Sequence, residues 1–177
     1  MGTWNSRGLR GSVLEEMINM TNDHYRDKGL ALIQKIPTPI TPVKIDQSTR
    51  HITLAYFEKQ STVDYIGAVQ GIPVCFDAKE CATTTFPIMN IHEHQIQFME
   101  DFEKQGGISF ILLFYSKLNE TYYIPFSDIK RFYDRSIEGG RKSFTYEEID
   151  KSFLMKSAPG ALIHYLKGVQ LDLERRE

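Results

Sequence analysis

Long apolar runs, abundant cysteine and a strong excess of charge are all missing from this sequence of 177 residues. No apolar stretch approaches the roughly 20 residues that cross a membrane. The first residues, MGTWNSRGLRG, lack the apolar core of a secretory signal peptide. The two cysteines, Cys75 and Cys81, flank a charged segment and do not form a disulfide framework. We therefore expect a protein of the reducing cytoplasm that does not enter a membrane.

The formal net charge is only −2, which argues against a protein that coats nucleic acid by bulk charge. Charge is nevertheless uneven along the chain. Residues 130–142, KRFYDRSIEGGRK, carry five basic and two acidic side chains, and residues 1–14 carry Arg7 and Arg10 without an acid. Each stretch is either an ordinary solvated face or a local contact for nucleic acid.

The pattern of apolar residues predicts one mixed α/β domain over residues 1–177. Residues 12–28 predict a helix in which Ser12 is the N-cap and Glu15 completes a capping box. Asn90 is the expected cap of a second helix, which ends at Gly106. We expect a short buried strand at 30–36, a helix at 90–105, strands at 108–116 and 121–126, short helices at 127–135 and 146–151, and an amphipathic C-terminal segment at 160–173.

A proline-rich segment interrupts this pattern. Pro37, Pro39 and Pro42 cannot donate to a β-ladder, so residues 36–58 do not form a central strand. They read as an extended excursion that returns as a strand over 51–57. The alternatives are an edge hairpin, an ordinary loop, or an arm that projects from the domain and contacts a partner.

The stretch STVDYIGAVQGIPVCFDAKE, residues 61–80, predicts a β-hairpin with Gln70 and Gly71 in the turn. In that register the numbers of paired residues sum to 141, so Asp64 lies opposite Asp77, and Thr62 lies opposite Lys79. Opposed residues have Cβ atoms about 4.5–5.5 Å apart. Two carboxylates at that distance repel each other, and a bound cation offsets the repulsion. The alternative is a pair of exposed strand charges with a salt-bridged lysine.

Two acids and a lysine on adjacent strands fit metal-assisted hydrolysis of a phosphodiester. Asp64 and Asp77 offer the hard oxygen ligands that Mg²⁺ prefers. Lys79 shares the face of Asp77 and can offset charge in the transition state. A zinc site built from the two cysteines with His92 and His94 is a weaker alternative. Its spacing fits no closed zinc pattern, and we expect these histidines on different sides of a helix.

Six segments follow one another along the chain: RGSVLEEMINMTN, QKIPTPI, AYFEKQSTVDYIG, FDAKE, TTTFPIMNIHEHQ and FYDRSIEGGRKS. In this order they make the chain similar to the RecU family of Holliday junction resolvases, in the PD-(D/E)xK nuclease superfamily. The resemblance runs from about Arg10 to Tyr165 and implies a restriction-endonuclease-like mixed β-sheet flanked by helices, with a projecting stalk at about 36–58. Residues 1–11 would be a flexible basic arm.

The resemblance also implies roles for individual residues. Lys79 matches the lysine taken to stabilise the transition state, and Glu15 matches an acidic position that faces the site. The cofactor would be Mg²⁺, for which Mn²⁺ would substitute. The positions that match metal-binding residues are Thr62, Asp64, Asp77 and Gln95. Candidate DNA contacts are Arg10, Lys44, Arg50, Arg141 and Lys142.

The implied activity is resolution of four-way DNA junctions by a homodimer that makes paired symmetric nicks in recombination and repair. A RecA-type recombinase and a branch-migration helicase are possible partners, and the location would be the cytoplasm, near the nucleoid. Two alternatives stay open. The chain is a related PD-(D/E)xK nuclease with another DNA substrate, or it is a non-catalytic factor that binds junctions or modulates a recombinase.

Overall fold

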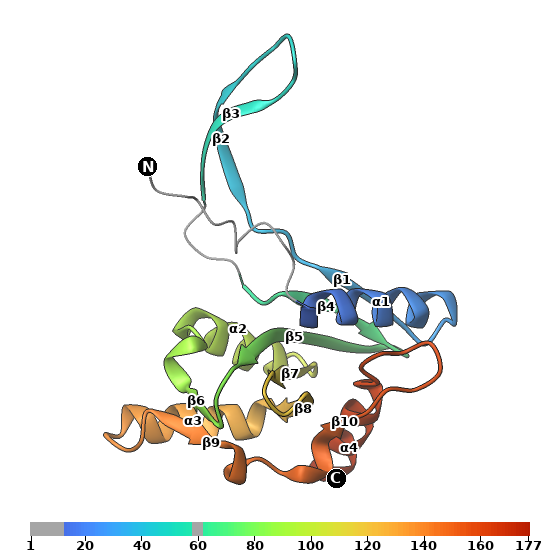
Figure 1. The fold of residues 1–177 in the computed structure, drawn as a ribbon, viewed down its shortest axis with the longest axis vertical. Helices are drawn as coiled ribbons and strands as arrows, with labels where there is room; N and C mark the ends of the chain where they lie inside the picture. The colour runs from blue at the N-terminus through green and yellow to red at the C-terminus, as the bar shows by residue number, and fades with distance from the viewer. Residues whose placement is uncertain (1–12, 58–61) are drawn as a thin grey trace.

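The computed structural model describes residues 13–57 and 62–177. Its centre is a six-stranded mixed sheet in the order β1-β4-β5-β7-β8-β10 (Figure 1). The sheet is antiparallel except where β5 and β7 run parallel. Its strands are β1 (Ala31–Lys35), β4 (Tyr65–Val69), β5 (Ile72–Cys81), β7 (Ile108–Tyr115), β8 (Glu120–Pro125) and β10 (Leu154–Met155).

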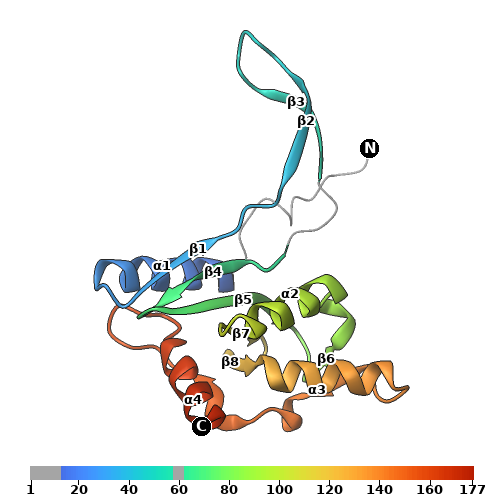
Figure 2. The same ribbon diagram turned by 180° about the vertical axis from the view of Figure 1, so that it is seen from behind.

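Helices cover both faces of this sheet. Helix α1 (Val13–Asp27) and helix α4 (Leu166–Arg176) pack on one face, in a core that includes Phe76 and Phe110. Helix α2 (Glu93–Lys104) and helix α3 (Phe126–Ile137) pack on the other, around Ile111 (Figure 2). The expected fold class, a mixed sheet flanked by helices, is confirmed.

A two-stranded hairpin projects away from the sheet (Figure 1). It consists of β2 (Ile40–Ile45) and β3 (Ile52–Phe57), paired antiparallel. Its side chains are largely exposed, and neither core includes a described residue of β2 or β3. Of the readings left open for the proline-rich segment, the projecting arm is the one observed, and we call residues 36–57 the stalk.

Most predicted elements occur close to their expected bounds, with four differences. Strand β1 is buried only at Ala31, because it is the edge strand of the sheet, and Leu32 is exposed. The region 146–151 forms two 3₁₀ turns, Tyr146–Glu148 and Lys151–Phe153, instead of a helix. Helix α2 starts at Glu93 with His92 as its N-cap, because Asn90 belongs to a 3₁₀ turn, Ile88–Asn90. The C-terminal helix begins only at Leu166.

A second small sheet, in addition to the β2–β3 hairpin, lies beside helix α3. Strand β6 (Thr85–Pro87) pairs antiparallel with β9 (Ser143–Thr145). Phe86 and Phe144 lie in the core beneath it, and Phe144 stacks on Phe132 of α3. Ser12, the expected N-cap of α1, lies outside the described residues. Among the helices described here, none combines the length and the apolar character needed to cross a membrane.

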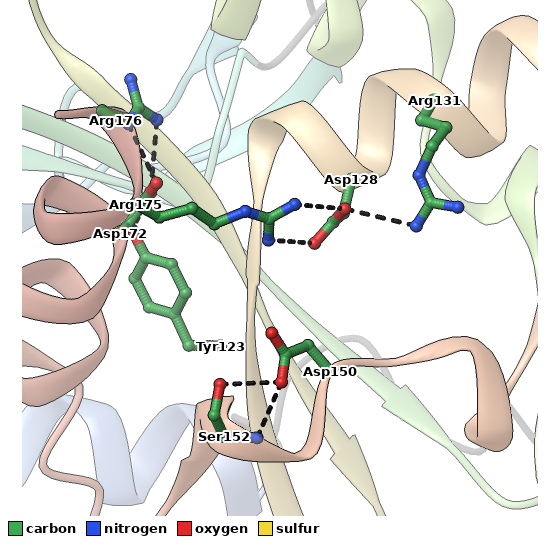
Figure 3. Close-up of polar contacts among 8 residues, drawn as sticks. All are labelled: Tyr123, Asp128, Arg131, Asp150, Ser152, Asp172, Arg175 and Arg176. Atoms are coloured by element: carbon green, nitrogen blue, oxygen red, sulfur yellow. Dashed lines mark hydrogen bonds and ion pairs between the residues drawn. The ribbon is translucent and has the colours of Figure 1, made fainter.

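Ion pairs tie helix α4 to the domain (Figure 3). Asp128 of α3 accepts two hydrogen bonds from Arg175, at 2.9 and 3.1 Å, and pairs with Arg131. Asp172 of α4 is buried and accepts a hydrogen bond from the Tyr123 hydroxyl at 2.7 Å. Arg176 pairs with the same Asp172 carboxylate. Because Tyr123 is buried beside this carboxylate, its pKa lies well above the ordinary value.

We expect Asp172→Ala to lower the free energy of unfolding by about 3 kcal/mol, because it leaves the buried Tyr123 hydroxyl without its acceptor and leaves Arg176 with its ion pair to Glu103 alone. The matched control is Asp23→Ala, which removes an exposed ion pair with Arg26 and should cost less than about 1 kcal/mol. Urea denaturation of both variants measures the difference. Equal losses in the two variants would contradict the structural role of Asp172.

Candidate active site

The site lies where the β4–β5 hairpin opens at the end away from its turn. Gln70 and Gly71 form the turn with φ angles of 48° and 88°, which is the tight turn that matches the twist of paired strands. Val69 pairs with Ile72, and the ladder continues to Tyr65 and Phe76. The predicted register is therefore confirmed, and the next pair along it is Asp64 and Asp77.

The two acids replace main-chain bonds at this point of the hairpin. The Asp64 N–H donates to Asp77 Oδ1 at 3.1 Å, and the Ala78 N–H donates to Asp64 Oδ2 at 3.0 Å. Each carboxylate is thus held by the backbone of the opposite strand. The Asp77 side chain is long enough to reach the Asp64 N–H. Both carboxylates are therefore oriented by main-chain hydrogen bonds.

Asp77 has two further partners. Its Oδ2 lies 2.5 Å from the Lys79 Nζ and accepts a hydrogen bond from the Gln95 Nε2 at 3.1 Å. The Asp77 side chain is fully buried, and Lys79 is about one-fifth exposed, at 19%. The Gln95 Oε1 accepts from the His92 N–H at 3.1 Å and lies 3.5 Å from the Lys79 Nζ. Helix α2 therefore begins on a side chain that also orients Asp77.

Burial and charge repulsion act on the acid pair. Burial, which is the largest cause, and the neighbouring Asp77 carboxylate together raise the pKa of Asp64 to about 7. The Ala78 N–H and the Lys79 ammonium oppose this change but are weaker. A carboxyl pair in this setting favours uptake of either a proton or a cation.

The donor set suits one kind of metal ion. Two carboxylates, with the amide of Gln95 beside them, offer hard oxygen ligands, and Mg²⁺ commonly binds through one or two carboxylates while keeping several waters. Within residues 13–57 and 62–177, no group of three or more His, Cys, Asp or Glu side chains is arranged to hold a metal. The chemistry of the two carboxylates therefore fits a hard divalent cation.

Two other predicted site residues, Thr62 and Glu15, lie on segments next to the acid pair. Thr62 is half-buried and precedes the first residue of β4, so its expected pairing with Lys79 falls outside the ladder. Glu15 lies on α1 and forms an ion pair with Lys35 of β1, at 2.7 Å. This contact differs from the capping role weighed for Glu15. Its role at the site stays a prediction.

The histidines next to Gln95 are arranged differently from our expectation. The rings of His92 and His94 stack with centroids 5.4 Å apart and an interplanar angle of 11°. The expectation that they lie on different sides was wrong because His92 is the N-cap and does not follow helical geometry. The spacing of His92 and Gln95, three residues apart, was the signal for this cap, and the sequence reading assigned it to Asn90.

Most basic side chains of the 130–142 stretch already have acidic partners. Lys130 pairs with Asp134, and Arg131 pairs with Asp128. Arg135 and Arg141 both pair with Glu148, at 2.5 and 3.6 Å. The stretch is therefore less available to phosphate than its composition indicates. Contacts of Arg141 and Lys142 with DNA stay a prediction.

The stalk presents the other candidate DNA contacts. Lys44 lies on β2, and Arg50 lies in the turn between β2 and β3 with a positive φ of 57°. Both are exposed. Large apolar side chains are exposed beside them, including Tyr56 and Phe57. Arg10 lies outside the described residues.

Comparison with known proteins places this site in a family. The family model for Recombination protein U matches residues 9–171. The chain belongs to this family. The match spans the hairpin with Asp64 and Asp77, the start of α2 with Gln95, and the whole stalk, so all the described candidate residues lie within it.

Relatives of the RecU family cover most of the chain. One from Leuconostoc mesenteroides, named Holliday junction resolvase RecU, is 42% identical over 172 residues, which is 94% of this chain and 83% of the relative. One of the same name from Lactococcus lactis is 47% identical over 146 residues, covering 80% and 68%. A solved structure of a Holliday junction resolvase, Hjc from Archaeoglobus fulgidus, is 11% identical, with a TM-score of 0.40, and the match covers 87% of this chain and 96% of that one.

Proposed function

We propose that this RecU-family protein is a metal-dependent endonuclease that resolves four-way DNA junctions. The observation that carries the proposal is the geometry of the hairpin end. Asp64 and Asp77 face each other with Lys79 beside them, an arrangement that suits metal-assisted hydrolysis of a phosphodiester. The family match and relatives named Holliday junction resolvase support the same activity.

The residues that would hold Mg²⁺ are Asp64 and Asp77, assisted by Thr62 and Gln95. When bound, the ion would polarise a phosphoryl oxygen and acidify a water, and Mn²⁺ would substitute for it. Gln95 orients the Asp77 carboxylate through its Nε2. Lys79 is close enough to Asp77 to neutralise it, and its ammonium can instead stabilise negative charge that develops on the phosphate. Glu15 is proposed as a supporting acid on α1.

The shape of the molecule supports a branched substrate. A stalk that projects from the sheet (Figure 1) can enter the opening at the centre of a four-way junction. The acid pair lies close to the base of the stalk, where the Ile36 N–H donates to the Asp64 carbonyl oxygen. Lys44 and Arg50 would contact phosphates, so affinity should fall as salt rises. A homodimer would present two identical sites to a two-fold symmetric junction and make two nicks. A cytoplasmic role beside a recombinase and a branch-migration helicase follows from this activity and is proposed with it.

A synthetic mobile junction with each strand labelled in turn tests this function. We expect paired nicks at symmetric positions in two opposite strands, dependent on Mg²⁺ and suppressed by EDTA. A linear duplex of equal length serves as the competitor. Equal affinity for the junction and the duplex would remove the junction-resolving function and favour another nuclease substrate. Binding without any cleavage would favour a non-catalytic junction factor.

A further inference from the structure

The base of the stalk is bonded to the residue that carries one of the two acids. The Ile36 N–H donates to the carbonyl oxygen of Asp64 at 2.8 Å. This bond continues the ladder between β1 and β4, which pairs Lys35 with Tyr65. It lies directly before Pro37, where the proline-rich connection to the stalk begins.

The main chain of Asp64 is therefore held from two sides. Its carbonyl accepts from Ile36 at the base of the stalk, and its N–H donates to Asp77 Oδ1 at 3.1 Å. Val63, the preceding residue, is fully buried and fixes the chain in the core. A displacement of Ile36 along the strand would act on the Asp64 peptide and, through it, on the hydrogen bond to Asp77.

The connection from Ile36 to the stalk is stiff. Pro37-Thr38-Pro39 precedes β2 and has fixed φ angles at both prolines. The residue before each proline is also restricted to extended conformations. Such a spacer transmits a change in stalk position to Ile36, whereas a glycine-rich spacer would absorb it. A second contact, the ion pair of Lys35 with Glu15, attaches the same strand to α1.

We propose that Ile36 is a positioning residue for Asp64 and that the stalk, when seated in a junction, aligns the acid pair through it. The inference rests on the proposed function and adds regulation of the same site. A DNA that does not hold the stalk would leave Asp64 less well aligned. Because small misplacements of a reacting group cost up to about 100-fold in rate, this coupling would contribute to selectivity for junctions.

The test makes the connection between Ile36 and the stalk strands flexible while it keeps both of them in the protein. Two glycines inserted between Ile36 and Pro37 decouple the stalk, and the double substitution Pro37→Gly with Pro39→Gly loosens the spacer at constant length. The matched control carries two glycines between Ser48 and Thr49, in the turn at the stalk tip. Thermal unfolding followed by circular dichroism verifies that all three variants are folded.

We expect junction affinity to stay within about threefold in the two base variants, while the ratio of junction cleavage to duplex cleavage falls at least about tenfold. The tip control should keep the ratio of the wild type. Wild-type selectivity in both base variants would overturn the proposal. An equal loss in the tip control would also overturn it, because stalk reach would then account for the effect.

A second readout does not depend on cleavage. In EDTA, junction binding should slow hydrogen exchange of the Asp64 amide in the wild type and in the tip control, but not in the base variants. Unchanged exchange in the wild type on junction binding would overturn the coupling. If the wild type binds junctions but never cuts them, the proposed function fails, whereas the exchange experiment still decides the coupling.

Discussion

Asp77→Asn is expected to reduce the single-turnover rate of junction cleavage by at least about 10³-fold, while junction affinity changes less than about threefold. Asn keeps the size of the side chain but removes the negative charge that would bind the cation. It also places an amide NH₂ where the carboxylate now accepts from Lys79 or Gln95. Affinity should persist because the stalk, which carries Lys44 and Arg50, is unchanged.

The matched control for this substitution is Asp101→Asn on helix α2. Asp101 is 59% exposed, and its partners among the described residues are two neighbours on the helix surface, Lys104 and Gln97. Cleavage by this variant should equal that of the wild type. A rate for Asp77→Asn within tenfold of the wild type would show that the hairpin end is not the reaction site.

Lys79→Met should reduce cleavage by about 10²- to 10³-fold, as expected for the loss of a group that stabilises transition-state charge. Its effect on cation binding should be the opposite of that of Asp77→Asn. The Lys79 ammonium lies 2.5 Å from Asp77 Oδ2, so its removal leaves the acid pair without a neutralising charge. Mn²⁺ should therefore bind as tightly as in the wild type, or more tightly.

A calorimetric titration with Mn²⁺ separates these two roles. Lys104→Met, which removes an exposed lysine of α2, is the control and should change neither binding nor cleavage. If Lys79→Met lost Mn²⁺ binding as completely as Asp77→Asn, then Lys79 would serve to hold the acids in place. Its proposed action on the phosphate would then be wrong.

The part of the site that could be predicted from the sequence depends on local chemistry. Gln70 and Gly71 specify the turn, the turn fixes the register, and the register places Asp64 beside Asp77. The parallel pairing of β5 with β7 was not needed for that result. The stalk was predicted for a similar reason, since prolines repeated at 37, 39 and 42 remove the N–H groups that a central strand would donate to its neighbours.

The features that the sequence reading missed depend on packing between distant segments. The position of β1 at the sheet edge depends on which strands lie beside it, and its composition alone favours burial. The partners of Arg135 and Arg141 also come from elsewhere, because Glu148 reaches them only once α3 and the second small sheet have packed together. Counting basic residues along the chain therefore overstates the free positive charge.

Strand β5 contributes to both cores, with Phe76 on one face of the sheet and Cys75 on the other, and it also carries Asp77. Substitutions near the acid pair are consequently constrained by folding as well as by chemistry. The stalk strands, whose described residues belong to neither core, are free of the first constraint. Evolution or an engineer can therefore change the length and surface of the arm, and with it the choice of DNA, while the hydrolytic centre stays the same.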